Sequence, residues 1–125
     1  MARRIRRLVV VANLVYAAVL LILGLVPDVP MLATGISDHA AHALAYAVQA
    51  GLLFALFLPL AGRGPAALLA GAGAVIYGGV VETLQLLQPS RTAEIFDLAA
   101  NAIGAGLTAS IAFLLTPRRE TGDGR

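Results

Sequence analysis

Four apolar segments of bilayer length dominate this 125-residue sequence and leave few folds open to it. The first covers residues 8–26 and is interrupted only by Asn13 and Tyr16. As a helix rising 1.5 Å per residue, such a segment is roughly 28 Å long, enough to cross a hydrocarbon core. The sequence therefore predicts an all-α integral membrane protein, one domain over residues 1–125 whose four transmembrane helices form a compact antiparallel bundle. The predicted spans are 8–26, 39–60, 65–87 and 93–115.

Charged residues are too scarce to cover a soluble surface. They make up 13% of the chain, whereas soluble domains carry about 25%. This composition excludes a soluble globular domain and a disordered chain, and the lack of cysteine excludes a disulfide scaffold or a thiolate site. The first segment could instead be a cleaved signal peptide, but its apolar stretch exceeds the usual core of about 7–15 residues.

The arginines predict the orientation of the bundle. All nine basic residues are arginines, and with four spans eight of them fall on one side while Arg91 falls on the other. The positive-inside rule then predicts a multi-pass protein whose tails, residues 1–7 and 116–125, both lie in the cytoplasm. Because the basic clusters adjoin apolar segments, their expected partner is anionic membrane lipid, and no nucleic acid partner is predicted.

Small residues recur at four-residue spacing in the third and fourth spans. Such stripes let helix backbones approach closely in lipid, so they predict tight helix packing. The stripes are Ala70, Ala74 and Gly78; Ala100, Gly104 and Thr108; and Ala102 and Gly106.

Polar residues collect at three span ends that the topology places outside the cytoplasm. In the second span they recur every four residues, which puts them on one helix face, and those in the third and fourth spans also share a face. Placing an ionisable group inside a bilayer costs free energy, so such groups by default mark a functional site. We therefore predict one binding site in the outer half of the membrane. Its candidate residues are Asp38, His42, Tyr46, Glu82, Gln85, Arg91, Asp97 and Asn101.

Simpler roles exist for several of these residues. Ser37 and Asp38 suit a helix N-terminus, and Tyr46 suits a buried aromatic position. The carboxylates and imidazoles of the set could bind a divalent metal ion. They also allow general acid–base work by His42 and Glu82, or binding of a phosphate or sugar through Arg91 and amide donors. No strong metal signature occurs, so the sequence predicts no metal site and leaves any cofactor undefined.

Four motifs in this region resemble the VanZ-like family, bacterial membrane proteins whose named member is associated with teicoplanin resistance. One departure concerns His39, because the family carries a lysine there and histidine is charged only when protonated. The resemblance covers about residues 37–110 and implies a bacterial cell-envelope membrane protein, without supplying a reaction. The motifs are Ser37-Asp38-His39-Ala40-Ala41-His42 with Tyr46, Glu82-Thr83-Leu84-Gln85, Pro89-Ser90-Arg91-Thr92, and Asp97-Leu98-Ala99-Ala100-Asn101 with Gly104.

Three functions remain open at this point. The leading hypothesis is binding of a cell-envelope lipid or glycan precursor, linked to glycopeptide resistance, with Arg91 holding the anionic part. The alternatives are an intramembrane acid–base or metal-assisted hydrolase of a lipid-linked substrate, with His42 and Glu82 as catalytic candidates, and a structural or accessory subunit. The oligomeric state does not follow from the sequence.

Overall fold

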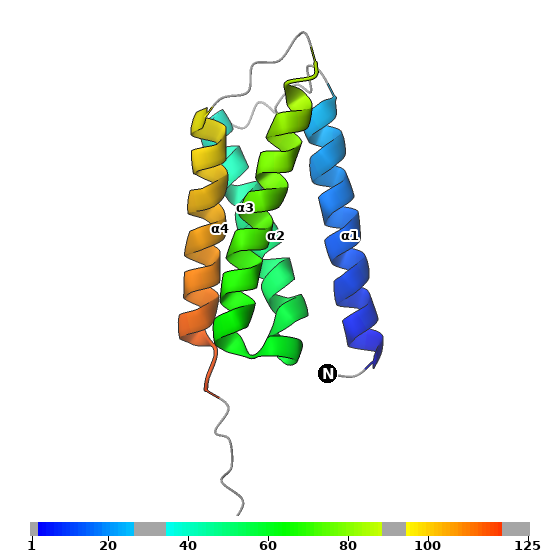
Figure 1. The fold of residues 1–125 in the computed structure, drawn as a ribbon, viewed down its shortest axis with the longest axis vertical. Helices are drawn as coiled ribbons and strands as arrows, with labels where there is room; N and C mark the ends of the chain where they lie inside the picture. Colours follow the sequence, from blue (N-terminus) through cyan, green and yellow to red (C-terminus); the bar gives the residue numbers. More distant parts are fainter. Residues whose placement is uncertain (1–2, 27–34, 89–94, 119–125) are drawn as a thin grey trace, which may run out of the picture.

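Four α-helices account for almost all of the chain that the structure describes. The computed structural model describes residues 3–26, 35–88 and 95–118, and no strand occurs among them. All four helices are long and apolar enough to cross a membrane, so the prediction of an all-helical protein with four helices of membrane-spanning length is confirmed (Figure 1). They are α1 (Arg3–Leu25), α2 (Asp38–Ala61), α3 (Arg63–Gln85) and α4 (Ile95–Leu115).

The helix ends differ from the predicted span ends by up to five residues. Helix α1 already begins at Arg3, because arginine is a good helix former and the helix continues beyond its apolar part. Helix α2 runs through Pro59, and only Gly62 separates it from α3. The φ of Gly62 is 77°, a conformation that favours glycine over residues with a Cβ atom. This turn makes α3 begin before Pro65.

The helices form an antiparallel bundle in which α1 is peripheral. Consecutive helices run in opposite directions (Figure 1). Helices α2, α3 and α4 all contact one another, while among the described residues α1 contacts only α2 and α3. The four-helix architecture is thus a three-helix core with one helix at its side.

Polar side chains attach α1 to that core. Asn13 Nδ2 donates to Leu52 O at 3.0 Å, and the Tyr16 hydroxyl donates to Ala45 O at 3.0 Å. Gln85 Nε2 donates to a backbone oxygen of α1 at 2.8 Å. Because lipid tails are as apolar as leucine, burial of apolar surface does not drive helices together in a membrane, and such interhelical hydrogen bonds help to do so.

Small residues fill the interior of the bundle. Ala70 and Ala74 have no exposed surface, and Gly78 and Gly104 are buried as well. A Cβ atom on Gly104 would lie 1.9 Å from the backbone oxygen of Ala43, so α4 and α2 touch through their backbones there. These positions confirm the predicted stripes on α3 and the first stripe on α4.

In the other α4 stripe, Gly106 does not mark a tight helix contact. Gly106 is exposed, and a Cβ atom there would meet nothing within 4 Å. The large apolar side chains also point outward. Leu14 is 66% exposed, Leu68 73% and Ile76 67%. This reverses the pattern of a soluble domain and is the one expected where hydrocarbon is the solvent.

Candidate functional site

Three helix ends carry the predicted site residues to one end of the bundle. Helix α2 begins there, α3 ends there and α4 begins there (Figure 1). All three carboxylates that the structure describes belong to this end, which we call the acidic end: Asp38, Glu82 and Asp97.

The opposite end of the bundle carries arginine. The start of α1, the turn between α2 and α3 and the end of α4 all lie at that end (Figure 1). We call it the arginine end, because every arginine among the described residues belongs to it: Arg3, Arg4, Arg6, Arg7, Arg63 and Arg118.

Local sequence starts α2 at the acidic end. Ser37 is the N-cap, with extended backbone angles, and its hydroxyl accepts a hydrogen bond from Ala40 N at 3.3 Å. Asp38 follows as the first helical residue, where a carboxylate also interacts favourably with the helix dipole. Asp38 is exposed, so its carboxylate can turn without disturbing the packing. His42 lies one turn further along α2, on the same face.

His42 is the centre of the site and contacts both other helices of the core. Its Nδ1 lies 3.1 Å from Asn101 Oδ1 on α4 and 3.7 Å from Glu82 Oε1 on α3. Its Nε2 lies 3.8 Å from Asp97 Oδ2 on α4. The predicted convergence is therefore observed for five residues, which we call the His42 site: Asp38, His42, Glu82, Asp97 and Asn101.

The hydrogen bond to Asn101 defines which imidazole nitrogen carries a proton. An amide oxygen can only accept, so His42 Nδ1 donates to Asn101 Oδ1. In the neutral imidazole Nε2 is then left with a lone pair, directed toward the carboxylate of Asp97. Asn101 has no exposed surface, so this acceptor is held in place by packing.

The site is mostly enclosed and is rich in carboxylate. The side chain of Glu82 is 9% exposed, that of Asp97 13% and that of His42 22%. The positive charges that the described residues can bring to it are those of His39 and His42 when protonated. Arg91, the predicted anchor for an anion, lies outside the described residues.

Three of the site residues have donor atoms close enough to share a ligand. One donor atom from each of Asp38, His42 and Asp97 lies within 4.8 Å of the other two. An imidazole nitrogen and two carboxylate oxygens are ligands for divalent metal ions. The sequence predicted no metal site because its ligands come from two helices and form no local motif.

Tyr46 borders the site, whereas Gln85 has another role. Tyr46 is 4% exposed, and a Cβ atom on Gly78 would lie 3.0 Å from its ring and 2.9 Å from Asn101 Nδ2. Gln85 donates to Gly24 O and thereby connects α3 to α1. The structure thus places Gln85 between helices, outside the group of residues that contacts His42.

Two residues at the acidic end were not among the predicted site residues. His39 Nδ1 donates to Asp97 Oδ1 at 2.9 Å, although the side chain of His39 is 52% exposed. Gly78 makes room for Tyr46 and Asn101, as described above. The position of His39 between Asp38 and His42 in the sequence was the signal for the first. The small-residue stripe on α3 was the signal for the second.

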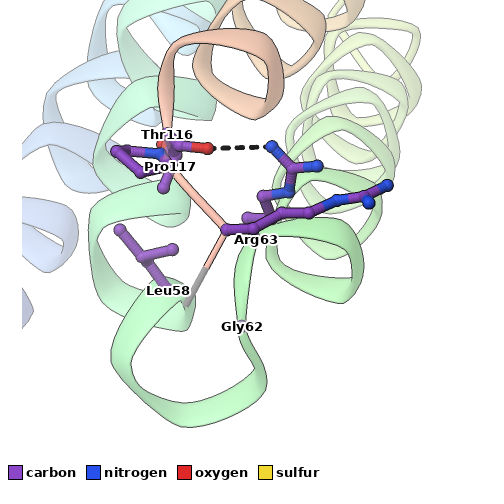
Figure 2. A pocket seen from close by; sticks show the side chains of 6 residues that line it. Leu58, Gly62, Arg63, Thr116 and Pro117 are labelled. Carbon is purple, nitrogen blue, oxygen red and sulfur yellow. Dashed lines mark hydrogen bonds between the residues drawn. The ribbon is translucent and has the colours of Figure 1, made fainter. Parts of the chain in front are cut away.

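A pocket of about 550 Å³ lies away from the His42 site, at the arginine end. Figure 2 shows Arg63 beside Gly62 with its guanidinium directed at the end of α4, where Nη1 donates to Thr116 O at 2.9 Å. The guanidinium also lies 4.5 Å above the ring of Phe113. These contacts use Arg63 to join the turn to α4. The pocket is lined by Leu58, Gly62, Arg63, Thr116, Pro117 and Arg118.

The chain was compared with known protein families, with curated protein sequences and with solved structures. None of these three comparisons found a match.

Proposed function

We propose that this chain is a multi-pass protein of a bacterial cytoplasmic membrane that binds the head group of a cell-envelope lipid or glycan precursor at the His42 site. Both termini face the cytoplasm in this proposal, and the acidic end faces outward. The resemblance of its motifs to the VanZ-like family supports the setting and suggests a link to glycopeptide resistance.

The separation of charge between the two bundle ends supports the orientation. The described arginines belong to one end and the described carboxylates to the other, and membrane proteins keep excess Arg and Lys on the cytoplasmic side. The chain has no cysteine, so single cysteines can report the topology directly. Ile36→Cys at the acidic end should react in intact cells with a maleimide that cannot cross the membrane, and Pro117→Cys should not. The reverse pattern would overturn the orientation.

The observation that carries the function is the enclosed polar cluster around His42. Helices α2 and α4 already pack through Gly104 and Ala43, so the bundle does not need ionisable groups for its packing. Carboxylates that are kept inside a membrane protein at such expense mark a binding or reaction site by default. Carboxylate, imidazole and amide groups together bind sugar hydroxyls, and Arg91 on the adjoining segment would bind a phosphate.

A lipid analysis of the purified protein tests this function. The full chain is purified gently and its bound lipids are identified by mass spectrometry, beside the variants Glu82→Gln and Thr83→Ala. Thr83 is exposed, and among the described residues its hydroxyl donates within α3, to Gly79 O, so it is a matched control. We expect an enriched envelope lipid that Glu82→Gln loses and Thr83→Ala keeps. Identical lipid profiles in all three proteins would overturn the proposal.

Acid–base hydrolysis of a lipid-linked substrate is the second candidate. The distance of 3.7 Å between His42 Nδ1 and Glu82 Oε1 favours it, because a base and an acid must lie within reach of one substrate. Turnover of polyprenyl phosphates by the purified protein, lost in both His42→Gln and Glu82→Gln, would establish this activity. If no substrate is consumed, binding remains the proposed function.

A further inference from the structure

From the contacts around His42 we infer that Asp38, His42 and Asp97 form a binding site for a first-row divalent metal ion at the acidic end. The role of the ion rests on the proposed function, since the ion would hold the anionic part of the head group. The existence of the metal site depends only on the positions of its ligand atoms.

The distance between His42 and Asp97 suits a shared ion. Two donors that bind one such ion at about 2.0–2.2 Å lie about 3–4.4 Å apart, depending on the angle between them. His42 Nε2 and Asp97 Oδ2 are 3.8 Å apart, which is within that range and too long for a hydrogen bond. The exposed carboxylate of Asp38, which lies within 4.8 Å of the other two, completes the set by a rotation of its side chain.

The contacts of His42 leave one ring nitrogen for an ion. Nδ1 is engaged by Asn101 Oδ1 at 3.1 Å, so Nε2 is the nitrogen that lies toward Asp97 Oδ2, at 3.8 Å. A ligand histidine usually donates its other ring N–H to a neighbouring acceptor in this way, which sets the tautomer and the ring orientation. Asn101 therefore has the place of such an outer partner.

Asp97 is oriented in the same manner. His39 Nδ1 donates to its Oδ1 at 2.9 Å, which leaves Oδ2 directed at His42. The two outer contacts, from Asn101 to His42 and from His39 to Asp97, together hold the inner ligands in position. Two of the three proposed ligands, His42 and Asp97, thus have an outer partner.

The donor set selects the class of metal. Imidazole favours Zn²⁺, Fe²⁺ and Ni²⁺ over Mg²⁺ or Ca²⁺, and two carboxylates also accept Mn²⁺. Three protein ligands leave at least one coordination position open. A phosphate oxygen of the head group would fill it. The charge of the ion also removes a difficulty of the proposed function, because carboxylates alone would repel an anionic ligand.

Metal titration of the full-length protein in detergent tests the site. The protein is stripped with a chelator and titrated with Zn²⁺, and Co²⁺ absorption spectra report the ligand geometry. We expect saturable binding of one ion per chain, lost in His42→Gln and weakened by Asp38→Asn. His39→Gln should weaken it about 10–100-fold, as is typical for removal of an outer partner. Thr83→Ala is the control and should bind like the unmodified chain.

Two results would overturn the inference: no saturable binding, or binding that His42→Gln and Asp38→Asn leave unchanged. Asp38 is exposed at the first residue of α2, so Asp38→Asn reports on the site even if His42→Gln fails to fold. The lipid analysis separates the two proposals. Metal binding without an enriched lipid refutes the proposed function alone, whereas an enriched lipid without saturable metal binding refutes the metal site alone.

Discussion

Replacing Gly104 by alanine should separate α4 from α2 and break the contact between His42 and Asn101. The new Cβ atom would lie 1.9 Å from Ala43 O, 2.7 Å from its carbonyl carbon and 2.9 Å from its Cα. All three are backbone atoms, so no side-chain rotation can relieve the overlap. Carbon–oxygen contacts between packed helices are about 3.3–3.6 Å. The helices must therefore move apart by about 1.4 Å at this level.

The energetic cost follows from that displacement. Overpacking of a tight interior costs about 1–3 kcal/mol, and an interhelical hydrogen bond in a membrane contributes about 0.6 kcal/mol. The distance of 3.1 Å between His42 Nδ1 and Asn101 Oδ1 would grow beyond hydrogen-bonding range. We expect Gly104→Ala to lower the free energy of unfolding by about 2–4 kcal/mol in total. The variant should also lose the affinity for Zn²⁺.

Unfolding in mixed micelles with increasing SDS, followed by circular dichroism, measures this difference. Gly106→Ala is the control on the same helix, because a Cβ atom at position 106 meets nothing within 4 Å. It should be neutral or stabilising by up to about 1 kcal/mol, since alanine favours the helix over glycine. Equal stability of the two variants would refute the reasoning that a backbone contact sets the distance between α2 and α4.

Three further substitutions test other contacts. For each variant, the change in the free energy of unfolding is measured by the same SDS unfolding. Gly78→Ala should lower the free energy of unfolding by about 1 kcal/mol, less than Gly104→Ala, because its new Cβ meets the ends of two side chains instead of backbone atoms; a cost as large as that of Gly104→Ala would contradict this. Gln85→Met, which keeps the volume but loses the bond to Gly24 O, should cost about 0.6 kcal/mol, and we expect unchanged metal affinity. Arg63→Met should cost about 0.5–2 kcal/mol through its lost ring and carbonyl contacts, and a neutral result would show that the turn needs no connection to α4.

Some buried polar atoms of the bundle lack a hydrogen-bond partner, and this lowers its stability. Asn101 Nδ2 and Gln49 Oε1 have no hydrogen-bond partner among the residues that the structure describes. An unsatisfied buried polar group costs about 1–3 kcal/mol. In Asn101 the amide nitrogen lacks a partner, while the amide oxygen orients the imidazole of His42. Such a loss of stability is expected at a site where the position of a side chain matters for binding.

The number of helices and the end at which each polar residue lies could be predicted from the sequence. Apolar length defines a span, and an even number of antiparallel spans assigns the starts of α2 and α4 and the end of α3 to one side. For that reason the grouping of Asp38, His42 and Asp97 was predictable without coordinates. The four-residue spacing of Ala70, Ala74 and Gly78 likewise predicted a packing face, since spacing alone determines which residues share a side of a helix.

The partner of each polar side chain was decided by the tertiary structure alone. Spacing gives a face of one helix, but the rotation of that helix toward its neighbours and the distance between the axes depend on how side chains fit together. Hence Gln85, on the same face as Glu82, bonds to α1 instead of the His42 site, and exposed His39 reaches Asp97. Gly104 lets α4 approach until Asn101 meets His42, whereas a Cβ atom on Gly106, from an equally regular stripe, would meet nothing within 4 Å. The sequence by itself determined which groups share one end of the bundle, and the close approach of α2 and α4 decided which of them touch.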